Sequence, residues 1–124
     1  MHVVTKKKED PTISKIYLSL AYDNVPTKLL LDKYGQPDYV RLYKCDNGFC
    51  ETHVIYEKLG IVLNLAPPYT DYQRGWAVEI SPESTIFEIY FIEVGLDSYW
   101  YNFPPDPKKI DEWKGYGTYS NPNN

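Results

Sequence analysis

Two cysteines stand close enough in the sequence to form a covalent bond. Cys45 and Cys50 are the 2 cysteines of the 124-residue chain, and they flank Asp46-Asn47-Gly48-Phe49, which has the composition of a tight hairpin turn. Opposed residues of an antiparallel pair have Cα atoms about 4.5–5.5 Å apart, within disulfide range. We therefore predict a Cys45–Cys50 disulfide and an oxidising compartment. The alternative is two free thiols in a cytosolic protein; structural zinc would need a second ligand pair, which the sequence lacks.

The side chains that could act as acids, bases or nucleophiles form no recognisable catalytic motif. His2 lies in a polar N-terminal stretch, and His53 falls on the predicted core face, where a lone histidine is usually structural. Glu88 and Glu93 are separated by an odd number of residues, so an unbulged strand places them on opposite faces rather than across one cleft. We predict no catalytic residues, no cofactor and no metal. A small hydrolase centred on His53 and a carboxylate is the alternative.

Aromatic residues offer the best candidates for binding. They make up 16% of the chain, with 13 tyrosines, and Tyr, Trp and Arg are enriched at binding hot spots. The candidate binding residues lie on two strands and in the stretch 66–76: Tyr39, Arg41, Tyr43, Tyr56, Tyr69, Tyr72, Arg74 and Trp76. The candidates of the stretch 66–76, with the group from Tyr99 to Phe103, could equally form a satellite core under the C-terminal segment.

The charge distribution excludes some classes of partner. The formal net charge is −4, and the basic run Lys6-Lys7-Lys8 is followed at once by Glu9 and Asp10, so no concentrated positive field is present for nucleic acid. No stretch approaches the roughly 20 apolar residues of a transmembrane helix. The polar start lacks the apolar region of a signal peptide. Either the protein is cytoplasmic, or an export signal has been removed before Met1.

The elements that must position these residues belong to an α+β domain. Residues 25–34 are a predicted short helix, because Asp23 and Asn24 suit its cap, Pro26 its first turn, and Gly35 with Pro37 its end. A strand is predicted before it, over 13–22, from alternating apolar residues. After it, 38–45, 50–57 and 61–65 form a predicted antiparallel meander, with Gly60 in a left-handed position in its second turn.

A register with Cys45 opposite Cys50 assigns the side chains of the meander to two faces. It pairs Lys44 with Glu51, Val40 with Ile55 and Tyr39 with Tyr56, all favourable cross-strand pairs. The predicted core face, covered by the helix, then holds Val40, Leu42, His53, Ile55, Leu63 and Leu65. The opposite face is predicted to be a tyrosine-lined surface for a partner, made of Tyr39, Arg41, Tyr43, Thr52, Val54, Tyr56 and Asn64.

The rest of the chain adds strands and a C-terminal segment. Residues 76–80 and 85–94 are predicted strands, and 85–94 is apolar on both faces, which is typical of a central or doubly covered strand. We predict about five or six strands in all. Asp106-Pro107 suits the start of a short C-terminal helix that carries Ile110 and Trp113. The predicted organisation is a flexible arm over 1–12, one domain over 13–103, and a segment over 104–124 that packs on the domain or trails from it.

Two segments are similar to parts of small bacterial envelope domains. Val25 to Val40 resembles the helix and Gly-x-Pro stop of outer-membrane-assembly lipoproteins of the SmpA/OmlA (BamE-like) type and of the β-lactamase-inhibitor-like fold. Tyr56 to Val62 is similar to their next hairpin. The resemblance implies an envelope-associated, non-catalytic interaction domain and assigns no binding residue.

The sequence thus predicts a non-enzymatic extracytoplasmic binding or structural module of the cell envelope. Its partner would be another protein or an envelope component, docked on the tyrosine-rich face or on the segment 66–75. The export signal would be absent from the chain, and a lipid anchor is compatible with this view. A second hypothesis is a small-ligand or carbohydrate-binding module in which Trp76 and neighbouring tyrosines stack on the ligand.

Overall fold

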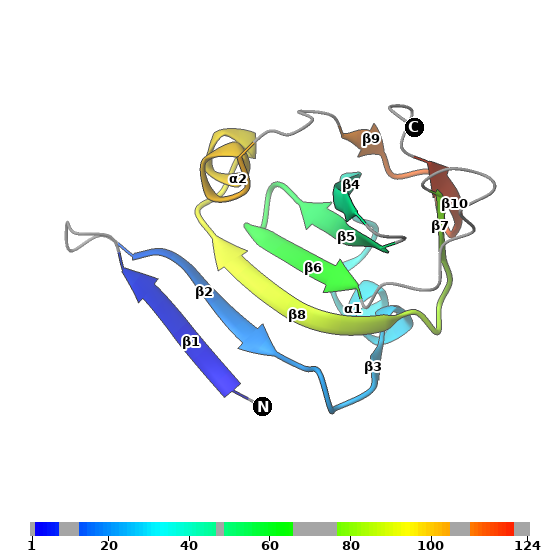
Figure 1. The fold of residues 1–124 in the computed structure, drawn as a ribbon, viewed down its shortest axis with the longest axis horizontal. Coiled ribbons are helices and arrows are strands. Elements are labelled where there is room, and N and C mark those ends of the chain that lie inside the picture. Colours follow the sequence, from blue (N-terminus) through cyan, green and yellow to red (C-terminus); the bar gives the residue numbers. More distant parts are fainter. Residues whose placement is uncertain (1, 8–12, 47–48, 66–76, 105–109, 121–124) are drawn as a thin grey trace.

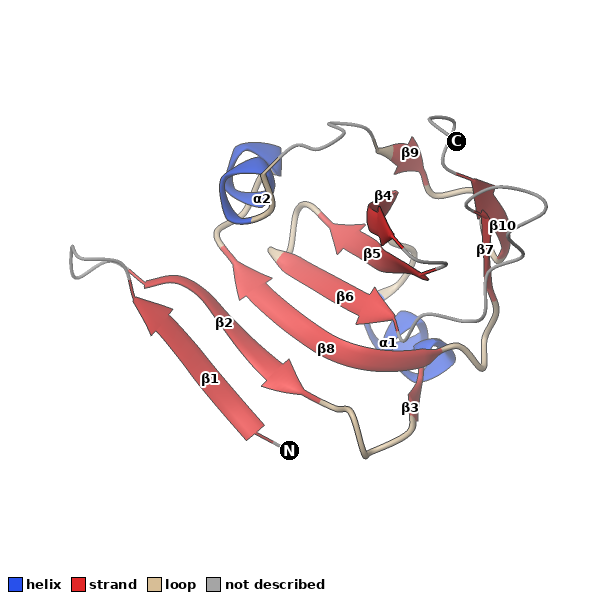
Figure 2. Ribbon diagram, viewed as in Figure 1, coloured by secondary structure: helices blue, strands red, loops and turns tan. Residues whose placement is uncertain are grey.

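The fold is α+β and built on a large antiparallel sheet, as predicted. A computed structural model describes residues 2–7, 13–46, 49–65, 77–104 and 110–120, and the side chains of residues 15–43, 51–65, 77–104 and 110–120. The elements, drawn in Figure 2, are β1 (His2–Lys7), β2 (Ile13–Ser19), β3 (Val25–Pro26), α1 (Thr27–Tyr34), β4 (Tyr39–Asp46), β5 (Phe49–Tyr56), β6 (Ile61–Leu65), β7 (Ala77–Ile80), β8 (Thr85–Ile92), α2 (Leu96–Asn102), β9 (Asp111–Glu112) and β10 (Gly117–Ser120).

The strands of the described residues form two sheets. The larger has eight strands, in the order β1-β2-β8-β6-β5-β4-β9, with β3 paired to one end of β8. The smaller is the two-stranded ribbon of β7 and β10. Strand β8 lies between β2 and β6 in the middle of the large sheet (Figure 1), which confirms the central position predicted from its two apolar faces. None of the helices in the described ranges is long and apolar enough to cross a membrane.

Helix α1 begins two residues later than predicted and ends where predicted. Val25 and Pro26 pair with β8 as the short strand β3, and the helix starts at Thr27, whose backbone N–H and hydroxyl both donate to the carbonyl of Ser84 at 2.8 and 2.7 Å. Gly35 has a positive φ of 85° and donates its N–H to the carbonyl of Leu31 at 2.8 Å. Glycine takes this conformation without steric cost, so it stops the helix.

The hairpin of β4 and β5 differs from the predicted register by one residue. Asp46 pairs with Phe49 beside the turn, but an irregularity between Tyr43 and Asp46 shifts the rest of the ladder. The observed pairs are Tyr39–Ile55, Val40–Val54, Arg41–His53, Leu42–Thr52 and Tyr43–Glu51, in place of the predicted Tyr39–Tyr56, Val40–Ile55 and Lys44–Glu51. Because side chains alternate with period two, the shift moves β5 side chains to the opposite face from the one predicted.

The predicted disulfide is not supported. Cys45 and Cys50 fall beside this register shift, and they are not among the opposed pairs of the described ladder. Their side chains lie outside the described residues. The structure therefore gives no support to the oxidising compartment that was predicted from this bond.

The turn between β5 and β6 follows the prediction. Gly60 has a φ of +66°, and a Cβ at this position would collide with the carbonyl oxygen of Ile92. The backbones of Gly60 and Ile92 are close because they are hydrogen-bonded: the N–H of Ile92 donates to the carbonyl of Gly60 at 2.8 Å. Glycine is therefore required here by both its backbone conformation and its lack of a side chain.

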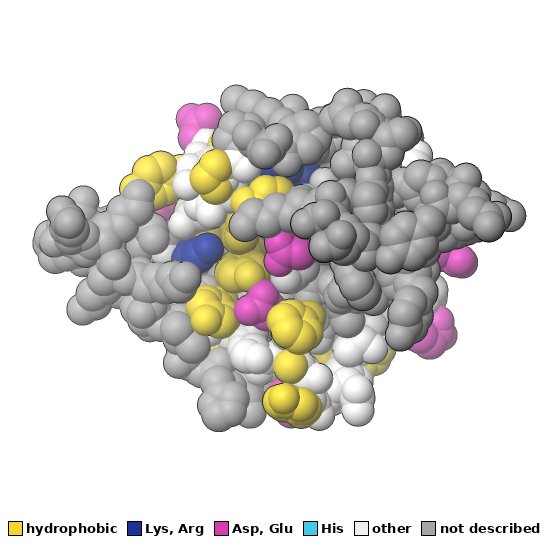
Figure 3. All heavy atoms as spheres, in the orientation of Figure 1, with side chains coloured by type: hydrophobic (Ala, Val, Ile, Leu, Met, Phe, Trp, Pro, Cys, Tyr) yellow, Lys and Arg dark blue, Asp and Glu magenta, His cyan; other side chains and the backbone are white. Residues whose placement is uncertain are grey.

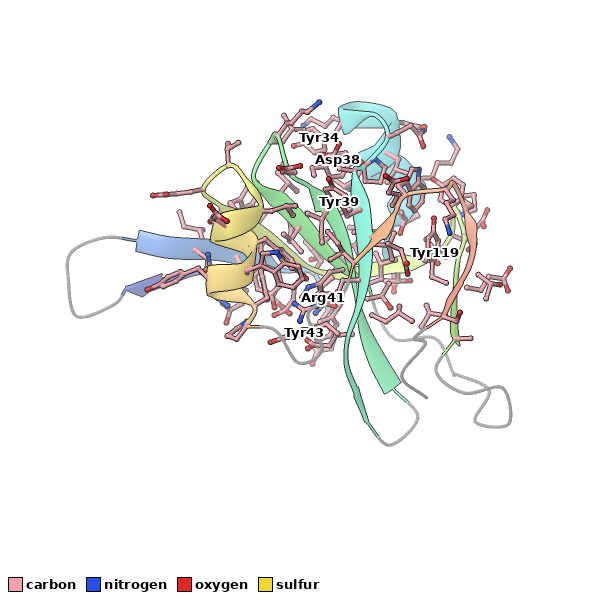
Figure 4. All side chains as sticks on the ribbon, turned by 90° about the horizontal axis from the view of Figure 1, so that it is seen from above. Tyr34, Asp38, Tyr39, Arg41, Tyr43 and Tyr119 are labelled. Carbon is pink, nitrogen blue, oxygen red and sulfur yellow. The ribbon has the colours of Figure 1, made fainter. Side chains whose placement is uncertain are left out.

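The two faces of the large sheet carry two separate clusters of buried side chains. The first-face core lies under α1 and the β7–β10 ribbon, and its buried members are Leu20, Leu31, Val40, Leu42, Val54, Tyr56, Ile61, Leu63, Leu65, Val78, Ile80, Ile86, Ile89 and Tyr119. The second-face core lies under α2, and its buried members are Tyr43, Ile55, Val62, Tyr90, Tyr99 and Phe103. Figures 1 and 4 show the two helices on opposite sides of the sheet.

Three segments differ from their predictions. Residues His2–Lys7, predicted to be part of a flexible arm, form strand β1 paired with β2. Leu96–Asn102 form helix α2, which was not predicted. The predicted C-terminal helix is not seen over the described residues 110–113; Asp111 and Glu112 instead pair with β4 as strand β9. Residues 117–120 pack on the domain, because Tyr119 is buried and β10 pairs with β7.

Candidate functional site

The tyrosines and the arginine that were predicted to line an exposed surface are buried or half-buried where the structure describes them. Arg41, Tyr43 and Tyr56 are 1%, 6% and 2% exposed, and Tyr39 is half-buried. Arg41 and Tyr43 project from β4 towards α2 (Figure 4), which covers them. Tyr56 lies in the first-face core, because of the register shift, and donates to the carbonyl of Gly35 at 2.7 Å. The other candidate binding residues, Tyr69, Tyr72, Arg74 and Trp76, lie outside the described residues.

Arg41 links β4 to the end of α2. One guanidinium nitrogen donates to the carbonyl of Phe103 at 3.0 Å and the other to the carbonyl of Pro104 at 3.2 Å. The guanidinium carbon lies 4.2 Å from the ring centre of Tyr43 and 4.7 Å from that of Trp100. Carbonyl oxygens and ring faces both stabilise a buried cation. Arg41 therefore holds α2 against the sheet.

His53 continues this network along the sheet. It lies directly opposite Arg41 on β5, and its Nδ1 is 2.7 Å from the hydroxyl of Tyr99. The same hydroxyl accepts a hydrogen bond from Arg41 at 3.3 Å. Burial raises the pKa of Tyr99 above its usual range, and the neighbouring Arg41 partly offsets this effect. Arg41, His53 and Tyr99 are hereafter the arginine network.

A second polar group lies beside the arginine network on the same face. The amide nitrogen of Asn64 is 3.1 Å from a carboxylate oxygen of Glu88 and 3.3 Å from one of Glu51, and it donates to both. The hydroxyl of Tyr90 donates to the same Glu88 oxygen at 2.5 Å. Burial, followed by this hydrogen bond, raises the pKa of Tyr90. Glu51, Asn64, Glu88 and Tyr90 are hereafter the carboxylate–amide cluster.

The strand register explains why these residues meet. Arg41 on β4 lies opposite His53 on β5, His53 opposite Asn64 on β6, and Asn64 opposite Glu88 on β8. Directly opposed residues of neighbouring strands point to the same face. A polar row therefore crosses four strands of the sheet, from the buried guanidinium to the carboxylate of Glu88.

The carboxylate–amide cluster is less covered than the arginine network. Asn64 is 3% exposed, whereas Glu51 and Glu88 are half-buried. Figure 3 looks onto this face and shows acidic side chains among hydrophobic ones over the middle of the sheet. The ring of Tyr90, within the cluster, and the ring of Phe103 beside it already hold a cation: the ammonium of Lys15 is 5.2 Å from the ring centre of Tyr90 and 4.7 Å from that of Phe103. The cluster therefore combines two carboxylates, an amide and aromatic ring faces.

One atom of the cluster has an unmet hydrogen-bonding capacity. The amide oxygen of Asn64 is buried and accepts no hydrogen bond within the described part of the chain. A buried acceptor without a partner costs about 1–3 kcal/mol. Such groups are rare in folded proteins.

Few features of the sequence indicate this cluster. The sequence relates Glu88 only to Glu93 and pairs Glu51 with Lys44 across the predicted hairpin, so neither glutamate is expected near Asn64. The available signal was the alternation along β6. It places Asn64 on the other face of the sheet from Leu63 and Leu65, which were correctly predicted as core residues. A polar amide in such an apolar strand is unusual, and the correct register would have brought it next to both glutamates.

No family model, curated protein or solved structure matches this chain. Among the described residues, no group of three or more His, Cys, Asp or Glu side chains is placed to hold a metal ion. The geometry of the second face therefore provides the observations that bear on function.

Proposed function

We propose that this chain is a non-enzymatic binding module that holds a small polar ligand at the carboxylate–amide cluster. The observation that carries the proposal is that the carboxylates of Glu51 and Glu88 both converge on the amide of Asn64, beside a layer of aromatic and aliphatic side chains. Apolar and aromatic walls with a few convergent polar groups are the usual composition of a ligand site.

The free-energy cost of burying the polar groups of the cluster supports a role beyond folding. Burying carboxylates and an amide requires each to find partners, and apolar side chains of similar size would usually stabilise a sheet as well or better. Asn64 sits between Leu63 and Leu65, which are both buried in the first-face core. Placing the cluster on adjacent strands also fixes its geometry, as a binding site requires.

The surroundings of His53 favour binding over catalysis. A general base needs an orienting partner and access to the group from which it takes a proton. His53 is 1% exposed, and its Nδ1 lies 2.7 Å from the phenol oxygen of Tyr99. We therefore assign His53 a structural role under α2, in place of the hydrolase centre considered from the sequence.

The proposal keeps the predicted binding role and changes its place. Of the predicted docking surface, Arg41 and Tyr43 are covered by α2 and Tyr56 lies in the first-face core, whereas Asn64 belongs to the proposed site. The predicted envelope location depended on the disulfide and on the family resemblance, and it is not needed for this proposal.

Ligand titration followed by NMR tests the proposal. Isotope-labelled protein would be screened against sugars, polyols, carboxylic acids and organic amines. We expect at least one class to shift backbone amide signals of β5, β6 and β8 near Glu51, Asn64 and Glu88, and expect Glu88→Gln to weaken that binding. Glu79→Gln is the matched control, because Glu79 is an exposed strand glutamate on β7. Failure of every class to shift these signals would contradict the proposal.

A further inference from the structure

Helix α2 covers the second face through a hydrogen-bonded network that contains a titratable imidazole. We infer that protonation of His53 breaks the arginine network and releases α2, so that this helix is an acid-sensitive cover of the second face. Three observations carry this inference: the direction of the hydrogen bonds at the hydroxyl of Tyr99, the burial of His53 beside a fixed cation, and the dependence of α2 on tertiary contacts. The release needs no ligand, so it is independent of the proposed function.

The hydrogen bonds at Tyr99 determine the protonation state of His53. The guanidinium of Arg41 can only donate, and it lies 3.3 Å from the hydroxyl oxygen of Tyr99. That oxygen therefore accepts from Arg41, and the hydroxyl hydrogen is available for the Nδ1 of His53, 2.7 Å away. Burial raises the pKa of Tyr99, so the hydroxyl keeps its hydrogen. Nδ1 is then the acceptor, and His53 is neutral with its proton on Nε2.

A proton added to Nδ1 is incompatible with this arrangement. The oxygen of Tyr99 would face two donors, one from Arg41 and one from His53, and the hydroxyl hydrogen would lose its present acceptor. Tyr99 and His53 are each 1% exposed, so water does not reach them while α2 is in place. A buried polar group that loses its partner destabilises the fold. Protonation should therefore separate Tyr99 from His53.

The charges around the imidazole do not remove this effect. The titratable and charged side chains around it in the described elements are Arg41 and Tyr43 on β4, Glu51 on β5, Glu88 and Tyr90 on β8, Lys15 on β2 and Tyr99 on α2. Arg41 lies directly opposite His53, whereas Glu88 lies beyond Asn64 in the polar row. Glu51 and Glu88 are both hydrogen-bonded to that amide. The carboxylates offset part of the repulsion between imidazolium and guanidinium, but burial disfavours the added charge and the lost hydrogen bond is not restored.

Helix α2 depends on these contacts for its order. It has seven residues and no side chain caps its N-terminus, and isolated helices of this length are not stable in water. Arg41 holds its end by donating to the carbonyls of Phe103 and Pro104, and the contact between Tyr99 and His53 holds its middle. The first-face core lies on the other side of the sheet. Breaking the network should therefore loosen α2 while α1 stays folded.

The sign of the pH dependence follows from the form of His53 that the fold favours. With α2 in place the neutral imidazole is favoured, so the stability of α2 is complete above the ordinary histidine pKa of about 6.5 and is lost as pH falls below it. Ordinary carboxylates take up protons only near pH 4, roughly, which lies below this interval. Release of α2 at acidic pH would remove the cover from Tyr43 and Tyr90 in the second-face core.

Hydrogen exchange on the full chain at about pH 7.5 and about pH 5.0 tests this behaviour. Exchange is expressed as a protection factor, the ratio of the intrinsic to the observed rate, because the intrinsic rate itself depends on pH. We expect the protection of α2 to fall about tenfold at the lower pH, within what one proton can supply, and that of α1 to change by less than about twofold.

Two variants identify the group that takes up the proton. His53→Asn keeps an amide near the position of Nδ1 but does not titrate in this interval, so the protection of its α2 should not fall at the lower pH. His2→Asn is the matched control: it removes the other of the 2 histidines of the chain and should leave the fall unchanged. A fall that persists in His53→Asn, or an equal fall in α1 and α2, would overturn the inference.

Nitrogen NMR of the imidazole in the unmodified chain gives a second measurement that needs no variant. We expect Nδ1 of His53 to be unprotonated at about pH 7.5, and to take up a proton over the same interval in which α2 loses protection. A proton on Nδ1 at the higher pH would contradict the assigned hydrogen bonds. Protonation of His53 without loss of protection in α2, or loss of protection without protonation of His53, would show that the two events are not linked.

Discussion

The two faces of the eight-stranded sheet are both covered, but they are closed by different means. The first face is closed by apolar contacts from α1 and from the β7–β10 ribbon, including Leu31, Val78 and Ile80. The second face is closed by α2, and its buried residues include Arg41, His53 and Asn64 as well as aromatic rings. One sheet therefore combines an apolar core, which supplies stability, with a polar-aromatic layer, which depends on specific partners.

The difference follows from the physics of each kind of contact. Apolar burial is non-directional and roughly proportional to area, so the first face tolerates several arrangements of similar side chains. Buried polar groups must meet particular partners at particular distances, and an unpartnered one is costly. We expect substitutions on the first face to change mainly the stability of the whole domain, and those on the second face to change α2 and the cluster.

The largest loss of stability is expected from removing apolar volume on the first face. Leu63 is 0% exposed in the first-face core. Leu63→Ala should lower the free energy of unfolding by about 2–5 kcal/mol, because it removes buried methyl groups and leaves a cavity. Chemical denaturation measures this loss, and Leu59→Ala is a control, because Leu59 is 50% exposed. Equal losses in the two variants would mean that the first-face core is not packed as described.

Removing the charge of Arg41 should have a smaller and more local effect. Arg41→Met keeps much of the side-chain volume but withdraws the donors to the carbonyls of Phe103 and Pro104. We expect a loss of about 1–3 kcal/mol, because the carbonyl of the buried Phe103 would lose this donor, whereas Pro104 is exposed and its carbonyl can bond to water. Hydrogen exchange should also become faster in α2 than in α1. Faster exchange spread evenly over both helices would argue against a role in holding α2.

The first face shows how far hydrophobic patterning leads from sequence to structure. The strand over 61–65, the helix stop at Gly35 and the core positions Val40, Leu42 and Leu63 all followed from period-two alternation and local turn chemistry. Each of these signals depends on residues that are close in the sequence, so it can be recognised without knowing which distant residues are in contact. The fold class was correct for the same reason.

The second face shows where such patterning fails. The ladder shifts between Tyr43 and Asp46, and nothing in the residues there indicates a bulge. One unrecognised irregularity exchanged the predicted faces of β5, moving Val54 and Tyr56 into the first-face core and Ile55 into the second-face core. The polar row could not be predicted, because it depends on the register of four strands at once.

Helix α2 was missed for a different reason. It has seven residues, it follows Gly95, and no side chain caps its N-terminus. Tyr99, Trp100 and Tyr101 make its sequence resemble a strand or a loop, since aromatic residues favour strands. The helix packs on Arg41 and His53, which are distant in the sequence. Local helix propensity does not reflect such contacts. The predicted exposed surface was wrong because this cover was not foreseen.

The pH dependence of the free energy of unfolding should show whether Tyr90 is buried and hydrogen-bonded on the second face. At neutral pH, Tyr90→Phe should lose about 1–2 kcal/mol with the hydrogen bond to Glu88. The folded state raises the pKa of Tyr90, mainly through burial. The protonated phenol is therefore favoured by folding, so its stabilisation is complete below the unfolded pKa of about 10 and is lost as pH rises above it.

Denaturation at several pH values measures this linkage. The unmodified chain should lose stability above about pH 10, and Tyr90→Phe should lose less over the same interval, because one raised phenol is absent. Tyr56 and Tyr99 also have raised pKa values from burial and should account for part of the remaining loss. An identical alkaline loss in Tyr90→Phe and the unmodified chain would show that Tyr90 is not held as described.

The smallest effect is expected from the ion pair on the outer side of α1. Lys28 donates to Asp32 at 2.5 Å, but their side chains are 62% and 64% exposed. Asp32 raises the pKa of Lys28 through a hydrogen bond and its charge, yet water and salt screen an exposed pair and its side chains lose entropy on pairing. Lys28→Ala should therefore leave the melting temperature within experimental error at physiological salt. A clear decrease there would mean that an exposed polar contact stabilises this sheet as much as a buried one such as Asn64–Glu88, and the contrast between solvent-facing and buried polar groups would fail.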